Sequence, residues 1–196
     1  MAEYTMKDAI FLSASVPDPK QNAVYHQTAD VTAIREAVIA LATYILPQTT
    51  LIWGGHPAIT PMIRVVAESI GVSVQEKIIL YQSSFFEKDF PIDNKVFEQI
   101  NLIQKRDTRD ESLEIMRGEM LSNHSYKAAV FIGGMKGVED EFYLFKKYHP
   151  DTSAFPIAST GAAARVLYER NRESLPESLN DEYSYFSLFR RLISFK

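Results

Sequence analysis

Residues 128–141 read Ala-Ala-Val-Phe-Ile-Gly-Gly-Met-Lys-Gly-Val-Glu-Asp-Glu, and this stretch decides the fold. Its first five residues are all apolar, which predicts a strand buried on both faces, as in a parallel sheet covered by helices on each side. From Gly137 onward, apolar residues recur at helical spacing at Val138, Phe142 and Phe145. A strand, a glycine turn and a helix in this order are typical of a β-α-β unit.

The same alternation of apolar runs and helical periodicity extends along the chain. The expected strands are Ala9 to Ser15, Thr50 to Gly55, Lys77 to Ser83, Ile100 to Gln104, Ala128 to Gly134 and Ser153 to Ser159. The expected helices are Asp30 to Leu46, Thr60 to Gly71, Asp110 to Leu121, Gly137 to Tyr148, Thr160 to Glu169 and a C-terminal helix, 181–196. This pattern predicts a three-layer αβα, Rossmann-like fold, doubly wound around a mainly parallel sheet of about six strands.

Two segments allow more than one interpretation. Phe85 to Asn94 places aromatic residues among charges and is expected to be a loop, either a lid over a ligand or an ordinary packed connection. The C-terminal helix, 181–196, carries an aromatic stripe that either packs back on the domain, seals a dimer or docks a partner. We expect a homo-oligomer and leave open an effector protein as partner.

Composition narrows the class of protein. A length of 196 residues with 46% hydrophobic content suits one domain, 1–196, built around one core. The formal net charge of -4, with 21 basic and 25 acidic residues intermixed, argues against a nucleic-acid partner. Without cysteine the chain has no disulfide, no thiolate zinc site and no cysteine nucleophile, which fits a cytoplasmic setting.

Targeting signals are not expected. The N-terminal apolar stretch, Ala9 to Leu12, is too short for a signal peptide. No apolar run approaches the roughly 18 residues that a transmembrane helix needs, so we expect a soluble protein with no membrane partner. The four histidines, His26, His56, His124 and His149, are scattered without ligand spacing, and we expect no metal site.

The strand-to-helix turns are the expected ligand site. Parallel strands joined by right-handed crossovers place these turns at one edge of the sheet, where ligands bind. Glycine lets the main chain approach a ligand, and a helix N-terminus presents free N-H groups that suit phosphate. We therefore expect a nucleotide, with no further cofactor required, to contact Ser13, Ser15, Gly54, Gly55, His56, Gly133, Gly134, Met135, Lys136, Gly137, Thr160 and Gly161. A valine at position 134 should then block the phosphate and leave the fold intact.

The carboxylates that follow Gly137 divide into two groups. Glu139 and Asp140 lie in the first turn of the predicted helix, where they are expected to complement the helix dipole. Glu141 completes a pattern that resembles the SLOG superfamily, which includes LOG-type cytokinin-activating phosphoribohydrolases, DNA-processing protein A and molybdenum cofactor carrier-like proteins. The LOG signature is proline, two glycines, any residue, glycine, threonine, two residues and glutamate. Gly133, Gly134 and Glu141 match it, and Gly137 follows one residue late.

The resemblance extends to two further motifs. The turn from Trp53 to His56 is similar to the first glycine turn of the family. In LOG enzymes an arginine on the helix before the signature strand works with the glutamate on the ribosyl bond, and Arg117 stands at the corresponding distance. The departures are Val138 in place of the threonine, Gly118 in place of a lysine, the extra residue after the glycine pair, and the absent proline.

These motifs imply binding of a nucleotide or nucleotide derivative. Because of the departures, the first interpretation is a SLOG-type sensor, as in bacterial conflict or signalling systems. The alternative is a nucleotide N-glycosidic hydrolase, a LOG-like phosphoribohydrolase in which Glu141 and Arg117 would be catalytic. A nucleoside deoxyribosyltransferase-like enzyme is a third candidate and would need a carboxylate nucleophile, for which Glu141 would serve by analogy.

Overall fold

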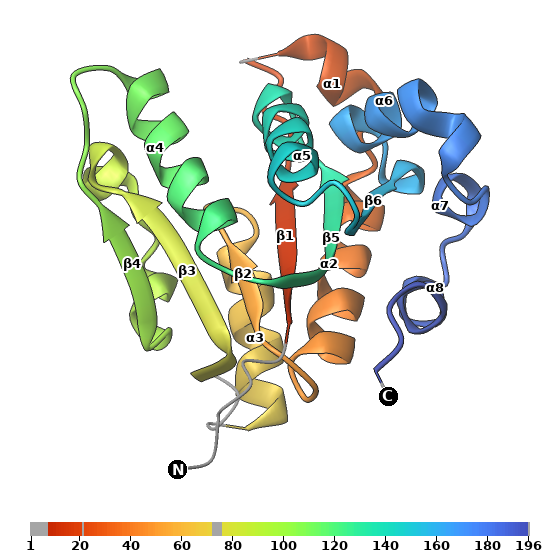
Figure 1. Ribbon diagram of the computed structural model, residues 1–196, viewed down its shortest axis with the longest axis horizontal. Coiled ribbons are helices and arrows are strands. Elements are labelled where there is room, and N and C mark those ends of the chain that lie inside the picture. Colours follow the sequence, from red (N-terminus) through yellow and green to blue (C-terminus); the bar gives the residue numbers. More distant parts are fainter. Residues whose placement is uncertain (1–7, 21, 72–75, 196) are drawn as a thin grey trace.

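A single parallel sheet organises the chain, as the computed structural model in Figure 1 shows. Residues 8–20, 22–71 and 76–195 are described by the structure. The sheet order is β4-β3-β2-β1-β5-β6, and every neighbouring pair is parallel. The strands are β1 (Ala9–Ser15), β2 (Leu51–Trp53), β3 (Ile78–Ser83), β4 (Gln99–Ile103), β5 (Tyr126–Gly133) and β6 (Ser153–Ile157). The chain grows outward from β1 on both sides, so the predicted doubly wound fold is confirmed.

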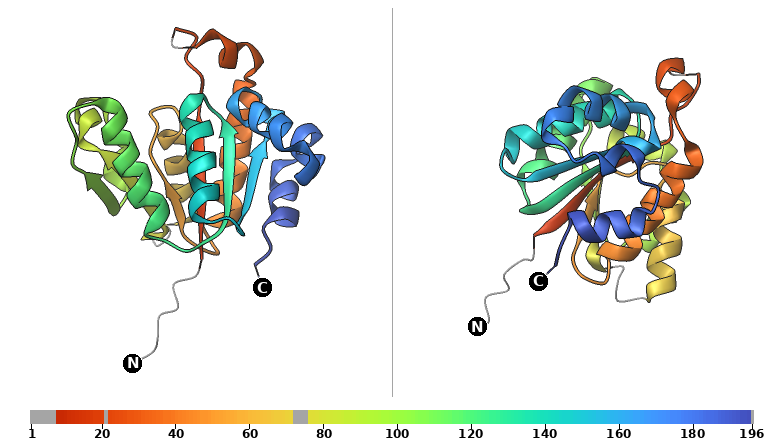
Figure 2. Two further views of the ribbon diagram at one scale, coloured as in Figure 1. Left: turned by 45° about the horizontal axis from the view of Figure 1, so that its top comes forward. Right: turned by 90° about the vertical axis from the view of Figure 1, so that its right-hand side faces the viewer.

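Helices cover both faces of the sheet and complete three layers (Figure 2). One face carries α2 (Val31–Ile45), α3 (Thr60–Ile70) and α8 (Tyr185–Leu192). The other carries α4 (Arg109–Ser122), α5 (Lys136–Tyr148) and α6 (Ala162–Asn171). Successive side chains of a strand point to opposite faces, so in β1 Ile10 and Leu12 join the first layer while Phe11 joins the second.

Aromatic packing fixes α5 against the centre of the sheet. Phe11 of β1 stacks on Phe145 of α5 with ring centroids 5.8 Å apart, and it meets Phe131 of β5 edge-on at 5.9 Å. All three side chains are fully buried. By the same alternation, Ser13 follows Phe11 on the α5 side of the sheet. The core packing thus brings the end of β1 against the first turns of α5.

Several boundaries differ from the sequence-based expectation. β2 ends at Trp53 rather than Gly55, because Gly55 has a positive φ of 71° that no strand continues. Phe85 to Asn94 is not a plain loop: most of it lies in two 3-10 helices, η2 (Ser84–Asp89) and η3 (Ile92–Val96), which Phe90 and Pro91 connect. A short helix, α1 (Ala23–Thr28), was missed because it has no buried residue and hence no apolar stripe.

The prediction of one continuous C-terminal helix, 181–196, is wrong. A short helix, α7 (Ser178–Asp181), ends at Glu182, which has extended backbone angles, and α8 begins only at Tyr185. The apolar stripe of α8 packs back on α2, where Leu188 and Phe189 are fully buried. Two further 3-10 helices, η4 (Ala158–Thr160) and η5 (Arg172–Ser174), flank α6. Lys196, and the N-terminal residues 1–7 where no leader was expected, lie outside the described residues.

Candidate functional site

A cavity of about 380 Å³ lies at the carboxyl ends of β1, β2 and β3. This volume falls within the range of about 300–1,000 Å³ that is typical of small-molecule sites. The helices after β1 and β5 cover opposite faces, so the two adjacent strands form a topological switch point, where doubly wound sheets bind ligands. The predicted site residues that line the cavity are Ser13, Ser15, Gly54, Gly55, His56, Met135, Gly137, Arg117 and Glu141.

Glu141 is held at this cavity by two donors from other elements. The Ser13 hydroxyl donates to Glu141 Oε2 at 2.6 Å, and Arg117 Nε donates to Glu141 Oε1 at 3.0 Å. The side chains of Arg117 and Glu141 are 15% and 13% exposed. A hydrogen bond between ionised groups is shorter and stronger than one between neutral groups, so this contact fixes both side chains. The structure thereby joins the two residues that sequence similarity had paired.

Gly137 makes room for that contact. A Cβ placed on Gly137 would lie 2.8 Å from Arg117 Nη2, so a larger residue would displace the guanidinium. The same arginine approaches Asp140, with Nη1 3.9 Å from Oδ2. Lys136 forms an ion pair with Asp140. Arg117 of α4 therefore joins Lys136, Asp140 and Glu141 of α5 in one cluster of mixed charge.

Five predicted ligand contacts do not line the cavity: Gly133, Gly134, Lys136, Thr160 and Gly161. Thr160 bonds within the protein, since its Oγ1 accepts from the Gly133 N-H at 2.9 Å and donates to the Ile157 carbonyl at 2.6 Å. A Cβ on Gly161 would lie 1.8 Å from the Thr28 carbonyl oxygen. These contacts show that the turn at 158–161 supports the backbone next to the site.

Gly134 also faces protein. Its φ is 84°, and a Cβ there would lie 2.2 Å from Val138 Cγ2 and 2.7 Å from its Cβ. The expectation that a valine at position 134 leaves the fold intact is therefore wrong, because the new side chain meets the first turn of α5 and a strained backbone. A loss of binding in that variant would not report on a phosphate.

Glu139 has a larger structural part than the helix-dipole interpretation predicted. It is 5% exposed, accepts from the Tyr25 hydroxyl at 2.5 Å and pairs with Arg170 Nη1 at 2.6 Å. A buried carboxylate needs such partners to offset its lost hydration. Burial, together with the hydrogen bond to Glu139, raises the pKa of Tyr25 to about 12. This network ties α1 to α5 and α6 beside the site.

His56, the histidine that was predicted to contact the ligand, lines the cavity. The backbone N-H of Ala58 donates to His56 Nδ1 at 3.2 Å, and burial lowers the pKa of the imidazole. A neutral ring whose Nδ1 accepts carries its proton on Nε2. His56 therefore supplies a neutral N-H donor next to the glycine turn.

Aromatic residues that the sequence analysis did not assign to the site form another wall. Phe86, Phe90 and Pro91 of the η2–η3 segment line the cavity together with Leu113 and Met116 of α4. Gln82 and Ser83, at the carboxyl end of β3, line it as well. Gln82 and Ser83 could have been predicted from the sequence, because two polar residues end an otherwise apolar strand. Part of the segment from Phe85 to Asn94 thus lines this cavity.

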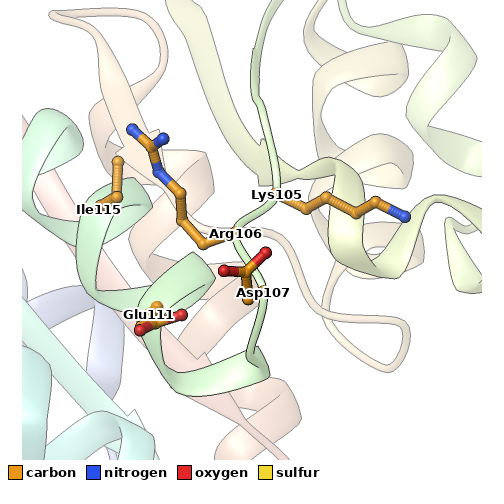
Figure 3. A pocket seen from close by; sticks show the side chains of 5 residues that line it. All are labelled: Lys105, Arg106, Asp107, Glu111 and Ile115. Carbon is orange, nitrogen blue, oxygen red and sulfur yellow. The ribbon is translucent and has the colours of Figure 1, made fainter.

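A second hollow, of about 390 Å³, is lined by Lys105, Arg106, Asp107, Glu111 and Ile115 (Figure 3). Figure 3 shows the Lys105 and Arg106 side chains pointing away from each other, with the carboxylates of Asp107 and Glu111 nearby. Its lining carries two basic and two acidic side chains, so no single charge sign favours one ligand group. The cavity at the switch point is the better candidate.

The described residues hold neither a cluster of metal ligands nor a helix that could cross a membrane. Within residues 8–20, 22–71 and 76–195, no group of three or more His, Asp or Glu side chains is placed to hold a metal ion. Among the helices of the same ranges, none combines the length and apolarity that crossing a bilayer requires.

A parallel sheet of this winding, with helices on both faces and a cavity at its switch point, defines the class of Rossmann-like α/β domains. The chain belongs to the SLOG cluster3 family, whose family model matches residues 24–193. The resemblance predicted from the glycine turns and Glu141 is thereby confirmed, and SLOG membership indicates a nucleotide-related function. A search of curated proteins found no match to the chain.

Proposed function

We propose that this chain is a sensor that binds a nucleotide or a nucleotide-derived signal in the cavity at the carboxyl ends of β1, β2 and β3. The observation that carries the proposal is the make-up of that cavity. One part is polar, where Ser13 and Arg117 both donate to Glu141, and another is apolar and aromatic, with Phe86 and Phe90. A nucleotide has the same division between its phosphorylated sugar and its base.

The polar cluster suits the sugar phosphate. Glu141 accepts one hydrogen bond on each carboxylate oxygen, which leaves a lone pair on each for a ribose hydroxyl. Arg117 uses Nε for Glu141, and its terminal nitrogens can donate to a phosphate in the planar geometry that guanidinium groups favour. The main-chain turn at Gly54 and Gly55 adds room for close approach of a ligand.

Binding is tested by thermal unfolding with nucleoside mono- and diphosphates, dinucleotides and ADP-ribose. A ligand at a hundredfold excess over its Kd should stabilise the protein by about 2.7 kcal/mol. Arg117→Met should weaken binding of the same ligand. Arg165→Met, which removes a surface ion pair of α6 outside the cavity, should leave that binding unchanged. If no compound of the panel stabilises the wild-type protein, the proposal is wrong.

Turnover is the second candidate, because Arg117 and Glu141 meet at 3.0 Å inside the cavity. In the LOG resemblance this pair acts on the ribosyl bond, and the reaction would be hydrolysis of an N-glycosidic bond with release of the free base. The assay follows base release from nucleoside 5′-monophosphates by chromatography, with Glu141→Gln as the inactive control. Wild-type protein that binds a nucleotide and releases no base would leave the sensor as the remaining interpretation. The SLOG resemblance favours a bacterial conflict or signalling system as its setting.

A further inference from the structure

The wall formed by η2 and η3 offers flat apolar surfaces to a ligand. Phe86 and Phe90 line the cavity, and both side chains are only partly buried. The Arg109 guanidinium carbon lies 6.0 Å from the Phe86 ring centroid, and Arg109 lines the cavity as well. Nucleobases stack on exposed aromatic rings and on guanidinium planes. This part of the site thus presents stacking surfaces that the sugar-phosphate contacts do not use.

Gln82 adds a hydrogen-bond donor to the same cavity. The side chain is 7% exposed, and its Oε1 accepts from Asn94 Nδ2 at 2.9 Å. That bond orients the amide, so Nε2 carries two N-H groups, and none of the hydrogen bonds among the described residues involves this nitrogen. A Cβ on Gly55 would lie 3.2 Å from this Nε2, which places the amide beside the glycine turn. The fold therefore holds a largely buried donor at the cavity wall.

Asn94, which orients Gln82, is itself incompletely bonded. It is 5% exposed, and its Oδ1 has no partner among residues 8–20, 22–71 and 76–195. A buried acceptor without a partner destabilises a fold, and such groups in proteins call for an explanation. Orienting Gln82 toward a ligand is such an explanation, because the Asn94 Nδ2 bond selects which end of the glutamine amide is left for the cavity.

We propose that Gln82, Phe86 and Phe90 form a base-reading subsite, with Asn94 as the residue that positions Gln82. The ligand class is a nucleoside phosphate whose planar base stacks on the phenylalanines and turns a ring nitrogen or carbonyl acceptor toward Gln82 Nε2. This inference rests on the proposed function and goes beyond it, since a cavity for a sugar phosphate alone would need neither the aromatic wall nor the oriented amide.

Calorimetry with the 5′-monophosphates of adenosine, guanosine, cytidine and uridine, and with ribose 5-phosphate, tests the subsite. At least one nucleotide should bind about tenfold or more tightly than ribose 5-phosphate, because base stacking adds affinity that the sugar lacks. Gln82→Met keeps the length of the side chain and removes the donor. This variant should lower the affinity for that nucleotide about five- to tenfold and leave the affinity for ribose 5-phosphate unchanged. Gln104→Met, an exposed position outside the cavity, should change neither.

Two further variants separate positioning from folding. Phe90→Leu should lower the affinity for the nucleotide without affecting the affinity for ribose 5-phosphate. The matched control is Phe186→Leu, on the exposed side of α8, which should change neither affinity. Asn94→Leu removes the bond that orients Gln82 while Gln82 itself remains. The ratio of nucleotide to ribose 5-phosphate affinity should fall in that variant, and a merely structural effect would lower both affinities together.

The outcomes distinguish this inference from the proposed function. Equal binding of the nucleotides and ribose 5-phosphate, or an unchanged affinity ratio in Gln82→Met, overturns the base-reading subsite and leaves ligand binding in the cavity intact. Absence of binding by all five probes and by the wider nucleotide panel overturns the proposed function, and the subsite with it.

Discussion

Replacement of Gly161 by alanine is expected to lower the free energy of unfolding by about 3–5 kcal/mol. Gly161 has φ 74° and ψ -159°, a region in which non-glycine residues cost about 1–3 kcal/mol. The added Cβ would also lie 1.8 Å from the Thr28 carbonyl oxygen. The backbone around Thr28 must then move away from the 160–162 turn.

Two hydrogen bonds join these segments and would be weakened by that movement. The Asp30 N-H donates to the Thr160 carbonyl at 3.2 Å, and the Ala162 N-H donates to the Thr28 hydroxyl at 3.1 Å. Each contributes about 1 kcal/mol. The expected loss therefore combines backbone strain with the separation of the α1–α2 connection from the turn before α6.

Two other glycines isolate these causes. Gly71 also has a positive φ, 123°, but a Cβ there meets no atom of the residues that the structure describes within 4 Å, so Gly71→Ala should cost only the strain, about 1–3 kcal/mol. Gly118 lies inside α4, and the nearest atom to its added Cβ is Tyr148 Oη at 3.9 Å. Gly118→Ala should stabilise the protein by about 0.5–1 kcal/mol, because alanine favours the helix.

Urea unfolding followed by circular dichroism measures all three variants against the wild-type protein. The reasoning fails if Gly161→Ala is as stable as Gly71→Ala, since the close approach to Thr28 would then not matter. If Gly161→Ala keeps its stability but loses nucleotide binding, the result would instead support the sequence-based prediction that Gly161 contacts the ligand.

Three further predictions concern pH and the C-terminus. Burial lowers the pKa of His56 below its value in the unfolded chain, so the free energy of unfolding should fall as pH drops below about 6.5. His56→Gln should reduce that fall in urea titrations at acid pH. Burial also lowers the pKa of His124, which accounts for the part of the fall that remains in this variant. The raised pKa of Tyr25 contributes stability below pH 10 that is lost as pH rises from 10.0 to about 12, and Tyr25→Phe should remove this part of the alkaline decline in the same titration. Truncation after Asn180 removes the two fully buried side chains of α8 and should cost about 3–6 kcal/mol. Thermal melting measures this loss of stability, and light scattering measures the oligomeric state. A truncation that changed only the oligomeric state would leave the melting temperature of the shortened chain unchanged, which would contradict the prediction.

Local pattern was sufficient for the architecture. The apolar run before Gly133 and the helical spacing after Gly137 identified a β-α-β unit, and its repetition along the chain predicted the parallel sheet. Periodicity failed where burial was absent or interrupted. α1 has no buried stripe, and the break at Glu182 lies in a segment whose apolar residues continue on both sides.

The candidate site was predictable as a set of turns but not as a set of contacts. Strand direction places Ser13, Gly55 and Gly137 at one edge of the sheet, and all three line the cavity. Sequence alone could not say that Gly161 accommodates Thr28, because a glycine signals only that space is needed, and the atom occupying the space comes from a distant segment.

The sequence by itself determined the parallel sheet, its glycine turns and the family signature at Glu141, because these depend on residues close together along the chain. Only the tertiary structure decided that Ser13 and Arg117 hold Glu141, and that Phe86, Phe90 and Gln82 face the same cavity. The physical reason is that helix packing across the sheet selects which side chains from separate elements meet, and no local periodicity records that choice.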